Sequence, residues 1–339
     1  MPFRSYKLTL DNKNQDNKDL PLYKGKKVAV VIPAHNEELL ISETIAGIPE
    51  YVARIYVVND CSTDHTQEVV ESYAKYDDII VPIQHEVNKG PGSAVVSGYK
   101  KSLEDRMDIV VTLDGDNQMD PVLMPLFLDP IVEGKCDFTK GNRLLSPDYS
   151  KDMSRWRYFG NSVLSLLTKI SSGYWSIVDP QNGYTAISRR ALQEIDVDKL
   201  YPGYGYLNDR LVRLNVFGFR IINIPHPARY GKEKSGIKYS TYIYRVSGLL
   251  LKNFLWRLKM KYIQLHFNPL VLLYIFGILF CLLAGIGGIF SFFHTIFMGF
   301  PILTSSIVLF ILLCLGLLMI FFAMFFDSRQ EKEMSKWYI

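Results

Sequence analysis

The sequence predicts an α/β domain with a parallel sheet, followed by two helices that cross a membrane. Short β-branched runs alternate with helical patterns between residues 28 and 113, and this order is typical of parallel strands joined by right-handed crossovers. Residues 262–326 then contain no Asp, Glu, Lys or Arg. A mostly aliphatic run of that length cannot be the core of a soluble domain of this size, so it indicates a bilayer.

Composition excludes a disordered or fibrous chain, because 48% of the 339 residues are hydrophobic and 13% are aromatic. The four cysteines are far apart and form no C-x-x-C pair, which excludes a readable disulfide framework or zinc knuckle and favours a reducing compartment. Residues 1–231 hold 27 Lys and Arg against 30 Asp and Glu, whereas residues 232–261 hold eight basic residues and one acid. We expect no nucleic-acid partner.

The elements of the α/β domain follow in order along the chain. Residues 1–24 lack apolar periodicity and are predicted to be a flexible cytosolic leader. The domain itself is predicted to span residues 25–236. Its first strands are expected at Val28–Ile32, Ile55–Val58, Ile79–Ile83 and Ile109–Leu113, with helices at 37–48, 64–75 and 91–105 between them. Ligands of such sheets bind beyond the carboxyl ends of the strands.

The apolar run divides into two predicted membrane helices, 267–293 and 301–326. At ~1.5 Å per residue, a helix of about 25 residues crosses a hydrocarbon core of ~30 Å. The connection carries no charge while basic residues flank both outer ends, so the positive-inside rule places both termini, including the tail 327–339, in the cytosol. The helices also offer a surface for homo-oligomer formation. The alternative is a buried helical hairpin in a soluble protein.

Residues 237–262 are predicted to form an amphipathic helix in the cytosolic interface of the bilayer. Basic residues alternate there with apolar residues at helical spacing: Ile243, Val246, Leu249, Leu250, Phe254, Leu258 and Tyr262. Such a helix would hold the domain close to the lipid surface. The alternative is a plain core helix of the α/β domain.

Two acidic residues follow the fourth predicted strand. Asp114 and Asp116 are two residues apart, so in an extended chain their side chains project the same way and can hold a hard cation such as Mg²⁺ or Mn²⁺. Gln118 could add a carbonyl oxygen. The alternative is a polar turn. At the other strand ends, Asp60 is predicted to face a ligand and Asp64 to cap a helix, while Glu37 has either a functional role or a favourable place on the helix dipole.

No nucleotide motif of the G-x-G-x-x-G or G-x-x-x-x-G-K-[ST] type follows these strands. The order Pro-x-x-Asn-Glu, Asn-Asp-x-Ser-x-Asp, Asn-x-Gly-x-Gly, Asp-x-Asp-x-Gln, Gly141-Asn142-Arg143 and Asp179-Pro180-Gln181-Asn182-Gly183-Tyr184 instead resembles family 2 glycosyltransferases. Within that family, residues 27–236 are most similar to polyprenyl- and dolichyl-phosphate sugar synthases. Two departures bear on the acceptor or sugar side: the motif that begins at Asp179, and the late motif Tyr230–Ser235.

The resemblance implies a GT-A fold and a role for each motif. The nucleotide would contact Pro33, Asn36, Glu37, Asp60, Lys89, Gly90 and Asp114, and a divalent cation would bind Asp114, Asp116 and Gln118. The acceptor phosphate would lie near Arg143, Arg157, Asn161 and Gln181. Catalysis would depend on Asp116, Arg143, Arg157, Asp179 and Asp209, although for Asp209 a capping role competes.

The implied reaction moves one hexose, namely mannose, glucose or N-acetylglucosamine, from a nucleoside-diphosphate sugar to a polyprenyl or dolichyl phosphate, with inversion. A phosphate acceptor is already an anion, so it needs cations to seat it rather than a strong base. Two alternatives stay open. One is a processive polysaccharide synthase of the same fold, although the Gln-x-x-Arg-Trp motif of that class is missing. The other is a non-catalytic nucleotide-sugar-binding scaffold on the membrane.

Overall fold

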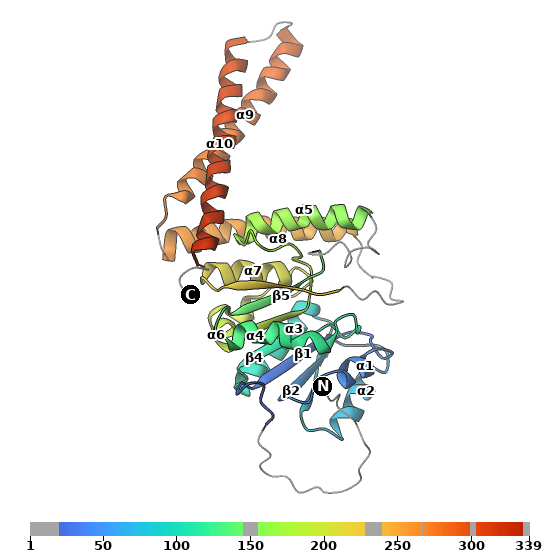
Figure 1. Ribbon diagram of the computed structural model, residues 1–339. Coiled ribbons are helices and arrows are strands. Elements are labelled where there is room, and N and C mark those ends of the chain that lie inside the picture. Colours follow the sequence, from blue (N-terminus) through green and yellow to red (C-terminus); the bar gives the residue numbers. More distant parts are fainter. Residues whose placement is uncertain (1–19, 145–154, 228–238, 266, 299–302, 335–339) are drawn as a thin grey trace.

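A computed structural model describes residues 20–144, 155–227, 239–265, 267–298 and 303–334 of the chain (Figure 1). Seven strands form one sheet in the order β3-β2-β1-β4-β6-β5-β7. The strands are β1 Val28–Ala34, β2 Arg54–Asn59, β3 Ile80–Gln84, β4 Ile109–Thr112, β5 Phe138–Asn142, β6 Thr185–Ser188 and β7 Ile221–Pro225. The first four confirm the predicted strands, and each end lies within two residues of its predicted position.

Six helices cover the two faces of the sheet. One face packs against α1 (Ile41–Ala46), α2 (Thr66–Ala74) and α4 (Met124–Val132), and the other against α3 (Pro91–Glu104), α6 (Arg189–Glu194) and α7 (Tyr206–Val216). The predicted helix 37–48 is shorter than expected, because the chain after β1 forms turns up to residue 40. The buried apolar side chains of β1, β2 and β4 fill the space between these layers.

The four predicted strands pair in parallel, as expected, but the complete sheet is mixed. Strands β1, β2, β3 and β4 pair in parallel, as do β5 and β7, but β6 runs antiparallel to both of its neighbours. Antiparallel pairing needs no crossover helix between the two strands, and a four-residue strand carries too little pattern to reveal its direction. The register aligns Ala34 of β1 with Asn59 of β2, so the ends of these strands meet at one edge.

Two long helices, α9 (Leu270–Met298) and α10 (Leu303–Met334), form a hairpin that projects from the domain (Figure 1). The segments Leu270–Met298 and Ser306–Glu331 are long and apolar enough to cross a membrane. The helices approach closely at Gly277 and Gly316, where a Cβ added to either glycine would lie within 3.0 Å of the other's carbonyl oxygen. Phe290 and Phe310 are each 67% exposed, which argues against the alternative of a buried hairpin.

Helices α5 (Arg155–Ser172) and α8 (Tyr239–Lys259) lie side by side between the sheet domain and the hairpin (Figure 1). A π-helical segment, Met260–Leu265, follows α8. The apolar stripe expected to face lipid is mostly buried against protein: Val246, Leu250, Phe254, Leu258 and Tyr262 are each less than 9% exposed. These side chains pack on α5 and α9 instead. The opposite side of α8 exposes Leu251 and Leu255, and α5 exposes Val163, Leu166 and Leu167.

Candidate active site

Hydrogen bonds join the loop after β1 to the loop after β2. The backbone N–H of Asn36 donates to Ser62 Oγ at 3.0 Å, and Asn36 Oδ1 accepts from the N–H of Thr63 at 2.8 Å. Asn36 adopts a φ of 59°, a left-handed conformation that asparagine tolerates better than most residues. The N–H of Glu37 donates to Thr66 Oγ1 at 2.9 Å. The side chain and backbone of Asn36, a predicted nucleotide-binding residue, therefore stabilise the loop after β2.

Asp64 receives hydrogen bonds at the start of α2, as the sequence predicts. Its carboxylate accepts from the backbone N–H and hydroxyl of Thr66 and from the N–H of Glu38. Partial burial disfavours the charged form, but these hydrogen bonds outweigh it and lower the pKa of Asp64. Asp64 therefore pairs the N–H of the first residue of α2, although the N-cap position itself is His65.

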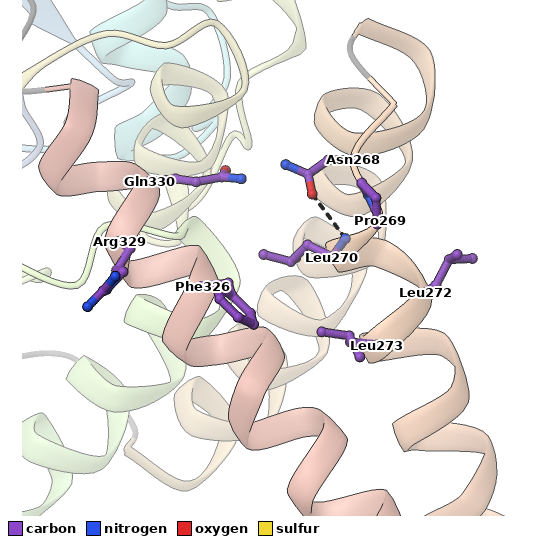
Figure 2. A pocket seen from close by; sticks show the side chains of 8 residues that line it. All are labelled: Asn268, Pro269, Leu270, Leu272, Leu273, Phe326, Arg329 and Gln330. Atoms are coloured by element: carbon purple, nitrogen blue, oxygen red, sulfur yellow. Dashed lines mark hydrogen bonds between the residues drawn. The ribbon is translucent and has the colours of Figure 1, made fainter.

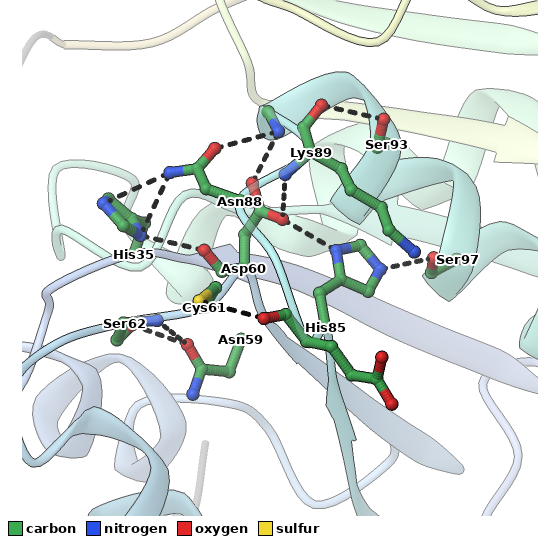
Figure 3. A network of polar contacts seen from close by, with 12 residues as sticks. His35, Asn59, Asp60, Cys61, Ser62, His85, Asn88, Lys89, Ser93 and Ser97 are labelled. Carbon is green, nitrogen blue, oxygen red and sulfur yellow. Dashed lines mark hydrogen bonds and ion pairs between the residues drawn. The ribbon is translucent and has the colours of Figure 1, made fainter.

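Asp60 is the centre of a buried polar network (Figure 3). Its carboxylate accepts from the backbone N–H groups of Lys89 at 2.9 Å and Gly90 at 2.7 Å, and from His85 Nδ1 at 2.7 Å. His85 Nε2 in turn contacts Ser97 Oγ on α3 at 2.8 Å. Asp60 therefore fixes the turn that begins α3 and leaves the side chain of Lys89 exposed at the strand ends.

The glycines of this turn are required by close packing. Gly90 has a φ of 90°, and a Cβ there would lie 2.8 Å from the carbonyl oxygen of Pro202. A Cβ at Gly92 would lie 2.2 Å from the carbonyl oxygen of Tyr201. The loop 201–205 thus packs directly on the start of α3. It also presents Tyr204, whose pKa is raised by burial and by the nearby charges of Asp114 and Glu37. Sequence reasoning did not select Tyr204 as a site residue.

Asp114 and Asp116 form a half-buried carboxylate pair just beyond β4. Burial and the charge of Asp116 raise the pKa of Asp114 to about 7, and burial also raises the pKa of Asp116. Asp116 Oδ1 accepts from the backbone N–H of Gln118 at 3.1 Å. Gly115, between the acids, lies against Pro33 and Glu37, because an added Cβ would be 3.4 Å from the Pro33 oxygen and 3.3 Å from Glu37 Cγ. The structure therefore brings Pro33 of β1, and Glu37 in the loop after it, to the residue between the two acids.

This pair fits a divalent cation. Two close carboxylates that resist ionisation in the buried environment are stabilised when a cation replaces the proton. Gly183 closes the site from the opposite side, since a Cβ there would lie 2.6 Å from Asp114 Oδ2. Among the described residues no cluster of three His, Cys, Asp or Glu side chains could ligate a metal. Two carboxylates suit Mg²⁺ or Mn²⁺, which often complete their coordination with substrate phosphates and water.

Arg143 follows β5 and is held by Asp179. Its Nε donates to Asp179 Oδ2 at 2.8 Å and its Nη2 donates to Oδ1 at 3.1 Å, a bidentate pair. Asp179 is buried, which opposes ionisation, but Arg143 lowers the pKa of this carboxyl below its usual value. The charge of Arg143 offsets part of the rise in the pKa of Asp114 and Asp116, so the Arg143–Asp179 pair lies near these carboxylates. These predicted site residues come together.

Two buried cations near Asp114 were not selected from the sequence. Lys140 of β5 is fully buried and donates from Nζ to the carbonyl oxygen of Asn182 at 2.6 Å. Burial and the charge of Arg210 lower the pKa of Lys140 to about 7. Arg210 of α7 contacts Tyr99 and Thr185 and lies over the ring of Phe138, 4.8 Å from its centroid. Lys140 lies in a short strand of mixed polarity and Arg210 is one of two arginines in α7, so neither position carries a sequence signal that marks it as part of the site.

The remaining predicted residues have other partners or are not described. Gln181 Nε2 donates to Asn208 Oδ1 at 3.1 Å. Both oxygens of Asp209 are used, because they accept from Asn253, Arg213 and the N–H of Tyr201. A catalytic role for Asp209 stays a prediction, and its visible effect is to join α7 to α8. The side chains of Arg157 and Asn161 on α5 lie outside the described residues.

Comparison with known proteins identifies the class of this domain. A family model described as Glycosyl transferase family 2 matches residues 29–196. The chain is 30% identical over 200 residues to the UDP-N-acetylglucosamine–dolichyl-phosphate N-acetylglucosaminyltransferase of Methanococcus voltae, a match that covers 55% of this chain and 79% of the relative. It is 26% identical over 206 residues to the undecaprenyl-phosphate mannosyltransferase of Micrococcus luteus, covering 59% and 82%.

The fold is similar to glucosyl-3-phosphoglycerate synthase from Mycobacterium tuberculosis, solved with Mn²⁺, UDP-glucose and glycerol 3-phosphate. The TM-score is 0.50 at 21% identity, over 69% of this chain and 80% of that one. These matches define a glycosyltransferase with a GT-A fold, which confirms the predicted fold class and enzyme class. The chain belongs to glycosyltransferase family 2.

Proposed function

We propose that this enzyme transfers one hexose from a nucleoside-diphosphate sugar to a polyprenyl phosphate held in the membrane. The observation that carries the proposal is the pairing of two sites at one sheet edge: the carboxylates of Asp114 and Asp116, and the Arg143–Asp179 ion pair. A carboxylate pair suits a metal-bound diphosphate, and an arginine beside it suits a second phosphate. The relatives from Methanococcus voltae and Micrococcus luteus are named for transfer to such lipid phosphates, which supports the acceptor class.

On the donor side, Asp114 and Asp116 would hold Mg²⁺ or Mn²⁺, and Pro33 and Glu37 lie against Gly115 between them. The cation, when bound, neutralises negative charge on the leaving diphosphate. The Mn²⁺ and UDP-glucose in the structural relative support this assignment. Asp60 keeps the Lys89–Gly90 turn in place through two hydrogen bonds, so we assign it a positioning role toward the nucleotide.

On the acceptor side, Arg143 would bind the lipid phosphate while Asp179 fixes the orientation of its guanidinium. A phosphate oxygen forms the new bond to the anomeric carbon as the bond to the diphosphate oxygen breaks, which inverts that carbon. The phosphate is already ionised at neutral pH, so Arg143 seats the nucleophile and no side chain has to remove a proton. Arg157 and Asn161 are proposed to join it from α5.

We further propose that α9 and α10 cross the bilayer and that both termini are cytosolic. Exposed leucines of α5 and α8 flank the base of the hairpin, with Lys252 and Lys259 also exposed on α8. Apolar side chains beside lysines suit the level of the lipid headgroups. In this arrangement the interface helix presents a different face from the stripe expected from sequence.

Two alternatives are disfavoured. A processive synthase would need a path for a growing polymer, and the described part of the chain offers two candidate membrane spans. A scaffold without activity would not need the Asp114–Asp116 pair. Purified protein in detergent, supplied with a panel of nucleotide sugars and a polyprenyl phosphate, should give a lipid carrying one hexose by mass spectrometry. Longer products would indicate the synthase.

The same assay tests the metal role. Asp116→Ala should abolish turnover, and excess chelator should abolish it in the wild type until Mg²⁺ or Mn²⁺ is restored. Full activity in excess chelator would overturn the assignment of the carboxylate pair. Absence of product with every donor, in the presence of metal, would favour the scaffold.

A further inference from the structure

The cytosolic end of α10 is bound to the catalytic domain by two acids one helical turn apart, Asp327 and Glu331, which we call the α10 foot. Asp327 receives a bidentate ion pair from Arg257 of α8, with Nη1 to Oδ1 at 3.0 Å and Nη2 to Oδ2 at 2.9 Å. The hydroxyl of Tyr262 donates to the same carboxylate. Glu331 accepts from the backbone N–H groups of Trp175 at 2.7 Å and Ser176 at 3.2 Å, and from the hydroxyl of Ser176.

The Arg257–Asp327 ion pair is buried. Arg257 is 0% exposed and Asp327 is 2% exposed, so water cannot replace either partner. Arg257 Nη2 also donates to the carbonyl oxygen of Ile170 in α5 at 3.0 Å, and Gly173 lies so close that an added Cβ would be 2.2 Å from Arg257 Nη1. Exposed ion pairs contribute little, but a buried pair with fixed partners resists displacement. The segment 170–176 is therefore bound by hydrogen bonds to Arg257 at its start and to Glu331 at its end.

This segment leads directly to the acceptor side of the active site. Three residues after Ser176 comes Asp179, the partner of Arg143. Between them, the carbonyl oxygen of Val178 accepts from Ser165 Oγ of α5 at 2.7 Å, so the short connection is held along its length. A movement of the α10 foot would therefore displace the Asp179–Arg143 pair, because only residues 177 and 178 separate Ser176 from Asp179.

We propose that the α10 foot is a positioning element that fixes the Asp179–Arg143 pair relative to the membrane hairpin. The inference rests on the proposed function, because it matters for an acceptor whose phosphate lies at the bilayer surface. Asp327, Glu331 and Arg257 act through Arg143 and touch no substrate. A bilayer-anchored phosphate has a fixed depth, so an arginine displaced from that depth loses the contact, whereas a water-soluble acceptor can follow the arginine.

The other side of the same helical turn supplies a control. Figure 2 shows Phe326, Arg329 and Gln330 of α10 beside a groove formed with the start of α9, with Gln330 and Asn268 pointing toward each other. Arg329 lies 5.1 Å from the ring centroid of Phe325 on its own helix. Arg329→Gln therefore removes a charge from the same turn without removing a contact to the segment 170–176.

The test compares two acceptors with full-length protein in lipid nanodiscs. Glu331→Gln, and separately Arg257→Met together with Asp327→Leu, should lower kcat/KM for a long-chain polyprenyl phosphate in the bilayer by about 10- to 100-fold, the cost of a displacement near 1 Å. The KM for the donor and the activity toward a short, water-soluble prenyl phosphate should stay within about twofold of the wild type by the same argument. Arg329→Gln should match the wild type with both acceptors.

Hydrogen–deuterium exchange gives a readout that is independent of activity. Glu331→Gln should speed exchange at the backbone amides of Trp175 and Ser176, which lose a charged acceptor. Equal losses with both acceptors would show that the foot only supports folding, and unchanged activity or unchanged exchange would also overturn the proposal. If the wild type is inactive with every prenyl phosphate, but Glu331→Gln still exchanges faster than the wild type at Trp175 and Ser176, the proposed function fails while the contact of Glu331 with segment 170–176 stands.

Discussion

Gly183→Ala should damage the proposed metal site while leaving the fold intact. The added Cβ would lie 2.6 Å from Asp114 Oδ2, whereas ordinary contacts begin at 3.4 Å. The carboxylate would therefore have to move by roughly 0.8 Å, and a misplacement of about 1 Å in a catalytic group can cost about 100-fold in rate. Met119 Cε, at 2.9 Å from the same Cβ, limits relaxation on the other side. We expect kcat/KM to fall about 100-fold and the free energy of unfolding by about 1–3 kcal/mol.

The assay measures turnover against Mn²⁺ concentration, because a displaced Asp114 should raise the metal concentration needed for half-maximal activity. Two other glycine-to-alanine variants serve as controls for the loss of activity in Gly183→Ala. The Cβ of Gly115→Ala would lie 3.3 Å from Glu37 Cγ, 3.4 Å from the Pro33 carbonyl oxygen and 3.5 Å from Ile41 Cδ1, so the expected loss is smaller. Gly248→Ala on α8 meets nothing within 4 Å and should raise stability by about 0.5–1 kcal/mol without changing turnover. Wild-type Mn²⁺ dependence in Gly183→Ala would refute the reasoning.

Three further predictions concern the acceptor, the membrane topology and pH. Arg143→Ala should lower kcat/KM for the lipid phosphate by about 10- to 150-fold while donor binding persists, and loss of nucleotide affinity alone would show that Arg143 serves the donor. A cysteine in place of His294 should react with an impermeant reagent from outside the cell, and labelling only after lysis would contradict the hairpin topology. Lys140 has its pKa lowered to about 7, so the unfolded chain binds more protons between pH 7 and about 10 and stability should rise with pH there. In unfolding measurements the slope of stability against pH should be up to about 1.4 kcal/mol per pH unit steeper in the wild type than in Lys140→Met, which keeps the contribution of Lys261. Equal slopes would show that Lys140 is more exposed to water than the structure indicates.

The parts of the fold that depend on local pattern could be predicted. Strands β1 to β4 are β-branched runs with polar residues at their ends. Strand alternation predicts that Asp114 and Asp116 project the same way, but β4 ends at Thr112 and residues 115 and 116 lie in a turn, so a turn rather than an extended chain places these two carboxylates. The direction of β6 could not be predicted, because nothing within Thr185–Ser188 distinguishes parallel from antiparallel pairing. Likewise the periodicity of α8 shows that one face is apolar, but lipid and a neighbouring helix bury the same kind of side chain.

The charge balance of the site could not be predicted because its members come from separate elements. Asp114 and Asp116 follow β4, Lys140 lies in β5, Arg143 follows it, Asp179 precedes β6 and Arg210 lies in α7. Burial disfavours the charged form of each acid and of Lys140, and opposite neighbours offset part of that cost. Asp179 is fully offset by Arg143, so its pKa falls, whereas Asp114 keeps a raised pKa near 7. The carboxylates without full compensation by a positive charge are therefore those of Asp114 and Asp116. A cation that carries the donor diphosphate would be stabilised most at this position. This difference between Asp114 and Asp179, set by which one has a bidentate arginine, separates the proposed donor side from the proposed acceptor side.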